Sequence, residues 1–346
     1  MSAFTFDFDL EDDLDESFDI IPPQNPTAAS TPEGLSEAEL PAEEIPLSEL
    51  LSALPEALSY SPLALPANGT TLVRRDLFDA RFQLLAQGRD AQAALVDAPA
   101  DLVPGVYEGG LKTWECALDL AAYLDRDALG AHAGLRVLEL GCGTAAPTLL
   151  LLGRLFAFLA SATAASDGER PETEIHLQDY NRAVLELVTL PNVLLAWYVS
   201  PLSAQYRASA PDADSDSDDG AASASARTRG HERRQGGLTV TPALLAAFTT
   251  SLDAHRVCLR FFSGGWTSLR AHWAARTGSP PPYDVVLASE TIYRTEALRP
   301  FLGVLYFGVG GGVREFVRVV EDEGGSVHTV WEHREGVGRR IMRVEW

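Results

Sequence analysis

A short run of the sequence, VLELGCGTA at residues 137–145, has the residue types that bind a nucleotide-like ligand. Its apolar residues predict a buried strand, and Gly141 and Gly143 predict a turn that opens a helix. Glycines at such a turn adopt positive φ at no steric cost and let a ligand approach the backbone without a Cβ in the way. In a doubly wound sheet, this first strand–helix turn is where a nucleotide-like ligand binds.

The acidic residue before the glycines favours one ligand class over another. Residues 141–146, GCGTAA, also fit the GxGxxA fingerprint of dinucleotide-binding turns, so the glycines alone leave a nicotinamide cofactor open. Glu139 lies two residues before the first glycine, where its carboxylate would attract a cation such as the ammonium of a methionine moiety and would repel a pyrophosphate. The run therefore favours S-adenosylmethionine. A nicotinamide cofactor, or a tight turn without any ligand, remains the alternative.

Polar and aromatic residues end three further predicted strands. Asp179 can accept hydrogen bonds from both hydroxyls of a bound ribose, or it can cap the helix that follows it. Trp266, in FFSGGW, can lie against a planar base or cap the core of the domain. Ser289, Glu290 and Tyr293, in SETIY, follow a buried strand at the sheet edge where ligands bind, and the glutamate can equally be a solvated loop residue.

The segment GGLKTWE at residues 109–115 precedes the alternating part of the fold. Lys112 is the only lysine of the chain, against 26 arginines, which is a mild indication that its compact ammonium group has a use there. Lys112 and Trp114 could form a lid over the cofactor. The alternative is that Trp114 anchors the segment to the core.

The elements that must position these residues alternate between strands and helices from residue 136 onward. Buried apolar runs predict strands at 136–142, 174–180, 257–263 and 283–290. Helical spacing predicts helices at 72–94, 115–124, 147–159, 182–190 and 242–255. Further strands are predicted at 305–309, 326–331 and 340–345, with a helix at 313–323. This alternation predicts an α/β fold with a doubly wound, parallel sheet.

Two segments are predicted to be disordered, an acidic tail at residues 1–68 and an insertion at 201–237, so that the folded domain covers 69–346. Residues 1–60 hold 15 acidic residues and no lysine or arginine, whereas the remainder holds 34 acids and 27 bases. The formal charge of −22 therefore lies largely in the tail. We expect a basic protein as the partner and no direct binding of nucleic acid, because no basic stripe is present.

The remaining composition bounds the compartment. The cysteines Cys116, Cys142 and Cys258 have no CxxC spacing, which argues against a disulfide scaffold or a cysteine-rich zinc site and fits a reducing compartment. The chain starts with alternating aromatic and acidic residues rather than with a signal peptide, and its best apolar run, at 149–160, is too short to span a bilayer. We expect a monomer in the cytoplasm and nucleus, without membrane contact.

Several motifs stand in a fixed order along the chain: YEGGLKTWECALDLAAYL, VLELGCGTA, LQDYN, VTLPNVLLAW, FFSGGW, VVLASETIY and YFGVGGG. The second resembles the first motif of the seven-strand methyltransferases, whose sheet is Rossmann-like. The others in this order resemble the histidine protein methyltransferases of the family-16 group, as does the opening FTFDFD. The resemblance covers about residues 100–200 and 240–346, and the combination of motifs is specific where any one of them is not.

The resemblance implies S-adenosylmethionine as the methyl donor and a histidine of a large-subunit ribosomal protein as the acceptor. Its cofactor contacts would be Glu139, Gly141 and Gly143 at the methionine end, Asp179 at the ribose and Trp266 near the adenine, with Lys112, Trp114 and Ser289 close by. Glu290 and Tyr293 would be the catalytic residues that face the incoming side chain. Related lysine enzymes carry an acid-x-x-Tyr motif at this place, so a lysine acceptor is an alternative.

The chain departs from the family pattern between SETIY and YFGVGGG, where relatives have a long helix. Only residues 294–304 intervene here, and a parallel crossover usually needs a dozen residues or more. The departure puts the strand at 305–309 and full activity in doubt more than cofactor binding. It keeps a non-catalytic binding module as an alternative, beside an NAD(P)-dependent oxidoreductase.

Overall fold

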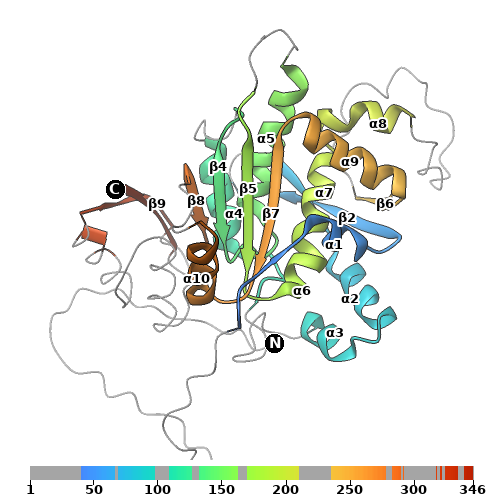
Figure 1. Cartoon of the computed structure of the whole chain (residues 1–346), viewed down its shortest axis with the longest axis horizontal. Coiled ribbons are helices and arrows are strands. Elements are labelled where there is room, and N and C mark those ends of the chain that lie inside the picture. Colours follow the sequence, from blue (N-terminus) through green and yellow to red (C-terminus); the bar gives the residue numbers. More distant parts are fainter. Residues whose placement is uncertain are drawn as a thin grey trace, which may run out of the picture. The chain divides into compact units, whose positions relative to one another are not determined.

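The computed structural model describes most of the chain from Leu40 onward (Figure 1). The described residues are 40–66, 69–97, 109–126, 132–162, 170–209, 235–277, 283–289, 291, 317, 320–321, 324–333 and 339–345. They belong to two compact units, one formed by Glu39–Val319 and one that contains Val320–Trp346.

The larger unit is built around a sheet in which the described strands have the order β1-β7-β5-β4-β8. These strands are β1 (Glu43–Ile45), β4 (Arg136–Leu140), β5 (Thr173–Asp179), β7 (Val257–Ser263) and β8 (Val285–Ala288). All pairs are parallel except β1 with β7. The order reverses at β4, which pairs with β5 on one side and β8 on the other. The α/β class with a largely parallel sheet is confirmed, and the carboxyl end of β4 is its topological switch point.

Helices cover both faces of this sheet. In Figure 1, α4 (Glu115–Arg126) and α5 (Ala146–Ser161) lie behind it and α10 (Trp266–Thr277) lies in front. Successive residues of β7 face opposite sides, as the pleat requires. Phe261 belongs to the core cluster that includes α5, whereas the ring of Phe262 lies 5.7 Å from that of Trp273 on α10. The predicted helices at 115–124, 147–159 and 242–255 are confirmed, the last as α9 (Pro242–Ala254).

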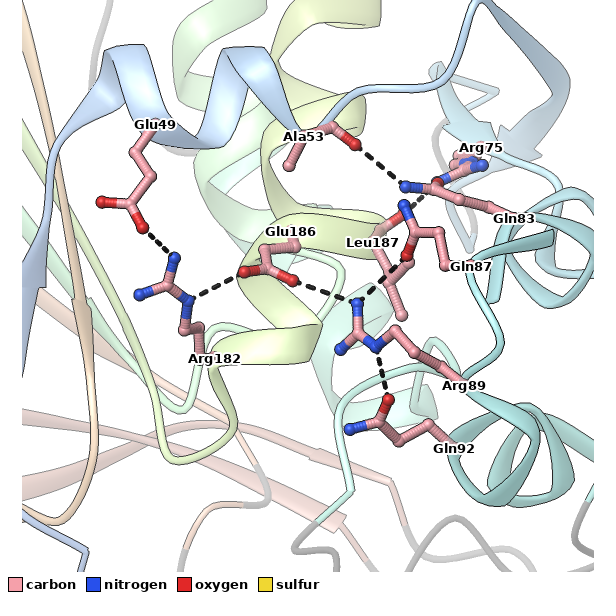
Figure 2. A network of polar contacts seen from close by, with 10 residues as sticks. All are labelled: Glu49, Ala53, Arg75, Gln83, Gln87, Arg89, Gln92, Arg182, Glu186 and Leu187. Carbon is pink, nitrogen blue, oxygen red and sulfur yellow. Dashed lines mark hydrogen bonds and ion pairs between the residues drawn. The ribbon is translucent and has the colours of Figure 1, made fainter. Parts of the chain in front are cut away.

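One helical segment follows β5: α6 (Arg182–Val184), the π-helical turn η1 (Leu185–Thr189) and α7 (Leu190–Tyr198). It includes the helix predicted at 182–190 and extends beyond it. Pro191 has no N–H to donate to the carbonyl of Leu187, four residues earlier. That carbonyl accepts a hydrogen bond from Nη1 of the buried Arg75 instead, at 2.9 Å (Figure 2).

The predicted acidic tail is wrong for part of its length. Residues 1–39 lie outside the described residues, but residues 40–66 form β1, α1 (Leu47–Ser52) and β2 (Ala57–Ala64). Ile45, Leu50 and Leu58 are each at most 1% exposed. The prediction failed because the segment is rich in acids, prolines and serines, while its strands β1 and β2 pair with β7, β3 and β6, which are separate in the chain.

Two more boundaries differ from the prediction. The helix predicted at 72–94 is a strand, β3 (Thr71–Arg75), followed by α2 (Leu77–Ala86) and α3 (Asp90–Asp97). The ends of the predicted insertion at 201–237 are ordered as η2 (Pro201–Ser203), α8 (Ala204–Ser209) and β6 (Gly236–Thr239), while 210–234 lie outside the described residues. β6 and β3 flank β2 in a second, antiparallel sheet, which accounts for both differences, because pairing partners far apart in the chain override local spacing.

The second unit contains a hairpin of β9 (Ser326–His333) and β10 (Arg339–Glu345), with an irregular register between Ile341 and Met342. It confirms the strands predicted at 326–331 and 340–345. The strand predicted at 305–309 and most of the helix predicted at 313–323 lie outside the described residues.

Among the described residues, no single helix has the length and apolarity to cross a membrane. The bent pair Arg182–Tyr198 and Pro201–Ser209 meets these two criteria only when it is counted together.

Candidate functional site

The glycine turn at the carboxyl end of β4 adopts the backbone conformation that its sequence predicts. Gly141 and Gly143 have φ of 59° and 50°. A Cβ on Gly141 would lie 2.2 Å from Cγ2 of Thr291, and one on Gly143 would lie 3.2 Å from the carbonyl oxygen of Gly110. Both positions therefore require glycine, for φ and for space. The groups that approach them closely belong to the chain itself, since Thr291 follows β8 and Gly110 precedes α4.

Asp179, at the end of β5, holds this turn. Its Oδ2 accepts a hydrogen bond from the N–H of Gly143 at 3.0 Å, and its Oδ1 accepts one from the N–H of Asn181 at 3.0 Å. Asn181, rather than Asp179, is the N-cap residue of the helix that follows. The carboxylate is 5% exposed and lies 3.1 Å from where a Cβ of Gly110 would be. It thus joins the strand end, the glycine turn and the segment before α4.

Gln178, which is not among the predicted site residues, connects the glycine turn with the segment after β7. Its Oε1 accepts hydrogen bonds from the N–H of Gly141 at 3.2 Å and from Nε1 of Trp266 at 2.8 Å. Its Nε2 donates to the carbonyl oxygen of Gly264 at 2.8 Å. A buried glutamine beside an aspartate at a strand end was the available signal. The amide links the half-buried Trp266 to the glycine turn. The sequence predicts that Trp266 lies at the same edge of the sheet, but not this link.

Glu139 is buried within β4, 1% exposed, and faces the first turn of α5. Its Oε2 accepts hydrogen bonds from the backbone N–H of Thr148, at 3.1 Å, and from the hydroxyl of Thr148. Burial raises the pKa of this carboxyl to about 7, the negative charge of Asp179 adds to the rise, and the bonds from Thr148 oppose it. Two acids thus lie in one low-dielectric site. A cation would lower the free energy of this arrangement, and a pyrophosphate would raise it.

The other predicted residues lie around this centre or outside the described residues. Ser289 is half-buried and follows β8, whose Ala288 pairs with Leu140 immediately before the glycine turn. Lys112 is half-buried, and Trp114 is 37% exposed. The segment before them is fixed at Gly109, whose carbonyl oxygen accepts from Nδ2 of Asn181 at 3.1 Å.

Glu290 and Tyr293, the predicted catalytic residues, lie outside the described residues. Thr291, between them, is described, and its side chain contacts the turn at Gly141. Thr291 therefore lies against the glycine turn at the switch point of the sheet.

The comparisons with known proteins point to one kind of relative. No family model matches the chain. Histidine protein methyltransferase 1 of Schizosaccharomyces pombe is 32% identical over 86% of this chain and 84% of its own length. The protein of the same name from Saccharomyces cerevisiae is 28% identical over 86% of this chain and 83% of its own length. A mouse homologue is 33% identical over 71% of this chain and 59% of its own length.

Proposed function

Because the chain belongs to the histidine protein methyltransferase family, we propose that it methylates a histidine side chain of a protein with S-adenosylmethionine as the donor. The observation that carries the proposal is the pair of buried carboxylates, Glu139 and Asp179, beside a turn whose two glycines have positive φ. This combination suits a nucleoside that carries positive charge and does not suit an anionic dinucleotide.

The residues at the switch point fit this cofactor. Asp179 would hold the ribose, since a carboxylate has lone pairs beyond the two that accept from Gly143 and Asn181. Trp266, fixed through its indole N–H by Gln178, would lie near the adenine. Glu139 would stabilise the cationic methionine end next to Gly141. Lys112, Trp114 and Ser289 would enclose the cofactor from the neighbouring segments.

When bound, S-adenosylmethionine supplies an electrophilic methyl group, and the acceptor must offer a neutral lone pair. A histidine, with a reference pKa of about 6.5, is largely neutral at pH 7, whereas a lysine, near about 10.4, must first lose a proton. The enzyme therefore has to orient the imidazole more than it has to deprotonate it. We assign this task to Glu290: its carboxylate accepts the N–H of one ring nitrogen, which fixes the tautomer and leaves the lone pair of the other nitrogen free to attack. Tyr293 would line the same acceptor site.

We propose a basic ribosomal protein of the large subunit as the substrate. Residues 1–39 hold 11 acids and no lysine or arginine, which supplies an electrostatic attraction for such a protein. This attraction would act before the substrate is incorporated into a ribosome. We propose that the enzyme acts as a monomer in the cytoplasm and nucleus, where the free ribosomal protein is present.

Isothermal titration with S-adenosylhomocysteine and mass spectrometry of a methylated ribosomal-protein fraction test the proposal together. We expect binding of the nucleoside, no binding of NAD(P)H, and a mass increase of one methyl group on a histidine. Methylation of a lysine would instead identify a lysine methyltransferase. Absence of any binding by the folded protein would refute the cofactor. Binding without turnover would indicate a non-catalytic module.

Glu290→Gln tests the role of the carboxylate. The variant should keep its affinity for S-adenosylhomocysteine and lose turnover. A neutral amide oxygen accepts the ring N–H more weakly than a carboxylate does, and the NH2 group of the amide cannot accept it at all. Unchanged turnover would remove Glu290 from the mechanism.

A further inference from the structure

The helical segment after β5 contacts the glycine turn through two buried polar side chains that the sequence analysis did not select. The hydroxyl of Thr189 donates to the carbonyl oxygen of Gly143 at 2.7 Å. The side-chain amide of Asn192 donates from Nδ2 to the carbonyl oxygen of Thr144 at 3.0 Å. Thr189 is 0% and Asn192 is 1% exposed, so solvent does not compete for either bond.

These bonds add to those by which Asp179 and Gln178 of β5 hold the N–H groups of the turn. Glycines at positive φ have many accessible conformations, and the carbonyl groups of such a turn can point in several directions. Asp179 accepts from the N–H of Gly143 on one side, and Thr189 donates to the carbonyl oxygen of the same residue on the other. The peptide groups on both sides of Gly143 are therefore fixed by side chains of two other elements, β5 and the π-helical turn η1.

The helical segment can serve as a fixed support because it is tied down at its far side. The amide oxygen of Asn192 accepts from the backbone N–H of Arg75 in β3 at 2.7 Å, and Arg75 donates to the carbonyl oxygen of Leu187 in the π-helical turn at 2.9 Å (Figure 2). Arg75 has a fully buried side chain that also pairs with Asp79 at 2.9 Å. Such a buried charge network has a defined geometry, which exposed ion pairs do not ensure.

Surface ion pairs extend the same support. Arg182 contacts Glu186 at 2.8 Å and also pairs with Glu49 of α1, and Glu186 contacts Arg89 at 3.4 Å (Figure 2). These pairs are partly exposed and contribute little each. The outer side of the segment is thus held by α1 through Glu49 and by Arg89, between α2 and α3, and apolar residues of α2 and α3 pack against Val184, Leu187 and Val188.

We propose that Thr189 and Asn192 are positioning residues for the cofactor. They hold the carbonyl groups of Gly143 and Thr144 in the binding conformation before the cofactor arrives, so that binding does not have to order the turn. The inference rests on the proposed cofactor. Preorganisation of this kind raises affinity by reducing the ordering cost, without a new contact to the ligand.

Thr189→Val tests the proposal, since it keeps the shape of the side chain and removes only the hydroxyl. We expect the dissociation constant for S-adenosylhomocysteine and the KM for S-adenosylmethionine to rise about tenfold, because a buried carbonyl loses its donor. Turnover at saturating cofactor should stay within about twofold, since the acceptor site is untouched. Thr189→Ser, which retains the hydroxyl, should restore the affinity. A purely structural role for Thr189 would lower the unfolding temperature without this division between KM and kcat.

A matched control is Thr249→Val in α9, whose hydroxyl donates only to carbonyl groups of its own helix, at 3.1 Å. It should leave cofactor affinity unchanged. If Thr189→Val does not fold, Asn192→Leu removes the second donor together with the acceptor for the N–H of Arg75, and it should likewise raise KM and leave kcat within about twofold. Wild-type affinity in the folded Thr189 or Asn192 variant would overturn the proposal, whereas a wild-type protein that ignores S-adenosylhomocysteine would refute the proposed cofactor instead.

Discussion

Replacing Glu139 by glutamine should stabilise the cofactor-free protein at neutral and higher pH. Burial raises the pKa of Glu139 from 4.5 to about 7. The folded protein thus retains a proton that the unfolded chain releases, and the free energy of unfolding falls as the pH rises from 4.5 to about 7. A shift of this size corresponds to about 3 kcal/mol at pH 8 and to nearly nothing at pH 4.5. Glu139→Gln cannot ionise, so it avoids this cost.

Urea denaturation of both proteins at several values between pH 5 and pH 8 measures the effect. Other groups titrate in the same range, but they are common to both proteins, so the difference between the two curves isolates Glu139. We expect the variant to gain stability relative to the wild type as the pH rises, by about 3 kcal/mol in full. Glu172→Gln, at an exposed glutamate just before β5, is the matched control. A difference between the Glu139 variant and the wild type that does not change with pH would refute the reasoning.

Three other perturbations follow from single features of the structure. His176 is buried, and burial together with the charge of Arg260 lowers its pKa to about 4, so stability should be lost as the pH falls from 6.5 toward 4. In His176→Phe the melting temperature should therefore depend less on pH in that range, and a pH dependence equal to that of the wild type would contradict this origin. Gly141→Ala should lower the free energy of unfolding by at least about 1 kcal/mol, because an L-residue is strained at φ of 59° and its Cβ would meet Thr291; equal stability in urea would show that the turn relaxes. A chain that starts at residue 46 should be less stable by about 2 kcal/mol than one that starts at residue 40, because it lacks the buried Ile45 and the pair of Glu44 with Arg260 at 2.7 Å; equal melting temperatures would assign β1 no role.

The parallel strands could be predicted from the sequence because their signal is local. β7 coincides with the predicted 257–263, since most of its residues are apolar and buried and they follow one another directly in the chain. β1 could not be predicted, because two of its three residues are glutamates and its pairing partner, β7, lies more than 200 residues away. The same reason explains the helix predicted over β3, where pairing with β2 decides the conformation.

The site shows a similar division. Glu139, Gly141, Gly143 and Asp179 could be selected because strand-end acids and paired glycines are recognisable along the chain. Thr189 and Asn192 could not, since each bonds to the backbone of a turn that lies 46 and 48 residues away in the chain, and for Gln178, 37 residues away, the only signal was its place beside Asp179. Their residue types are common in helices and strands. Only the fold shows that their donors and acceptors converge on one turn.

The buried carboxylate of Glu139 both lowers the stability of the cofactor-free protein and favours a cationic ligand. An ionised carboxylate at 1% exposure, with a pKa raised to about 7, is unfavourable in the free protein. A cationic ligand beside Glu139 would favour the ionised form, so binding should release a proton at pH 7 and become tighter as the pH rises through that value. Isothermal titration of S-adenosylhomocysteine in buffers of different ionisation enthalpy detects such a proton. If the protein binds S-adenosylhomocysteine but releases no proton, Glu139 only accepts the hydrogen bonds of Thr148 at the start of α5 and does not stabilise the methionine end of the cofactor.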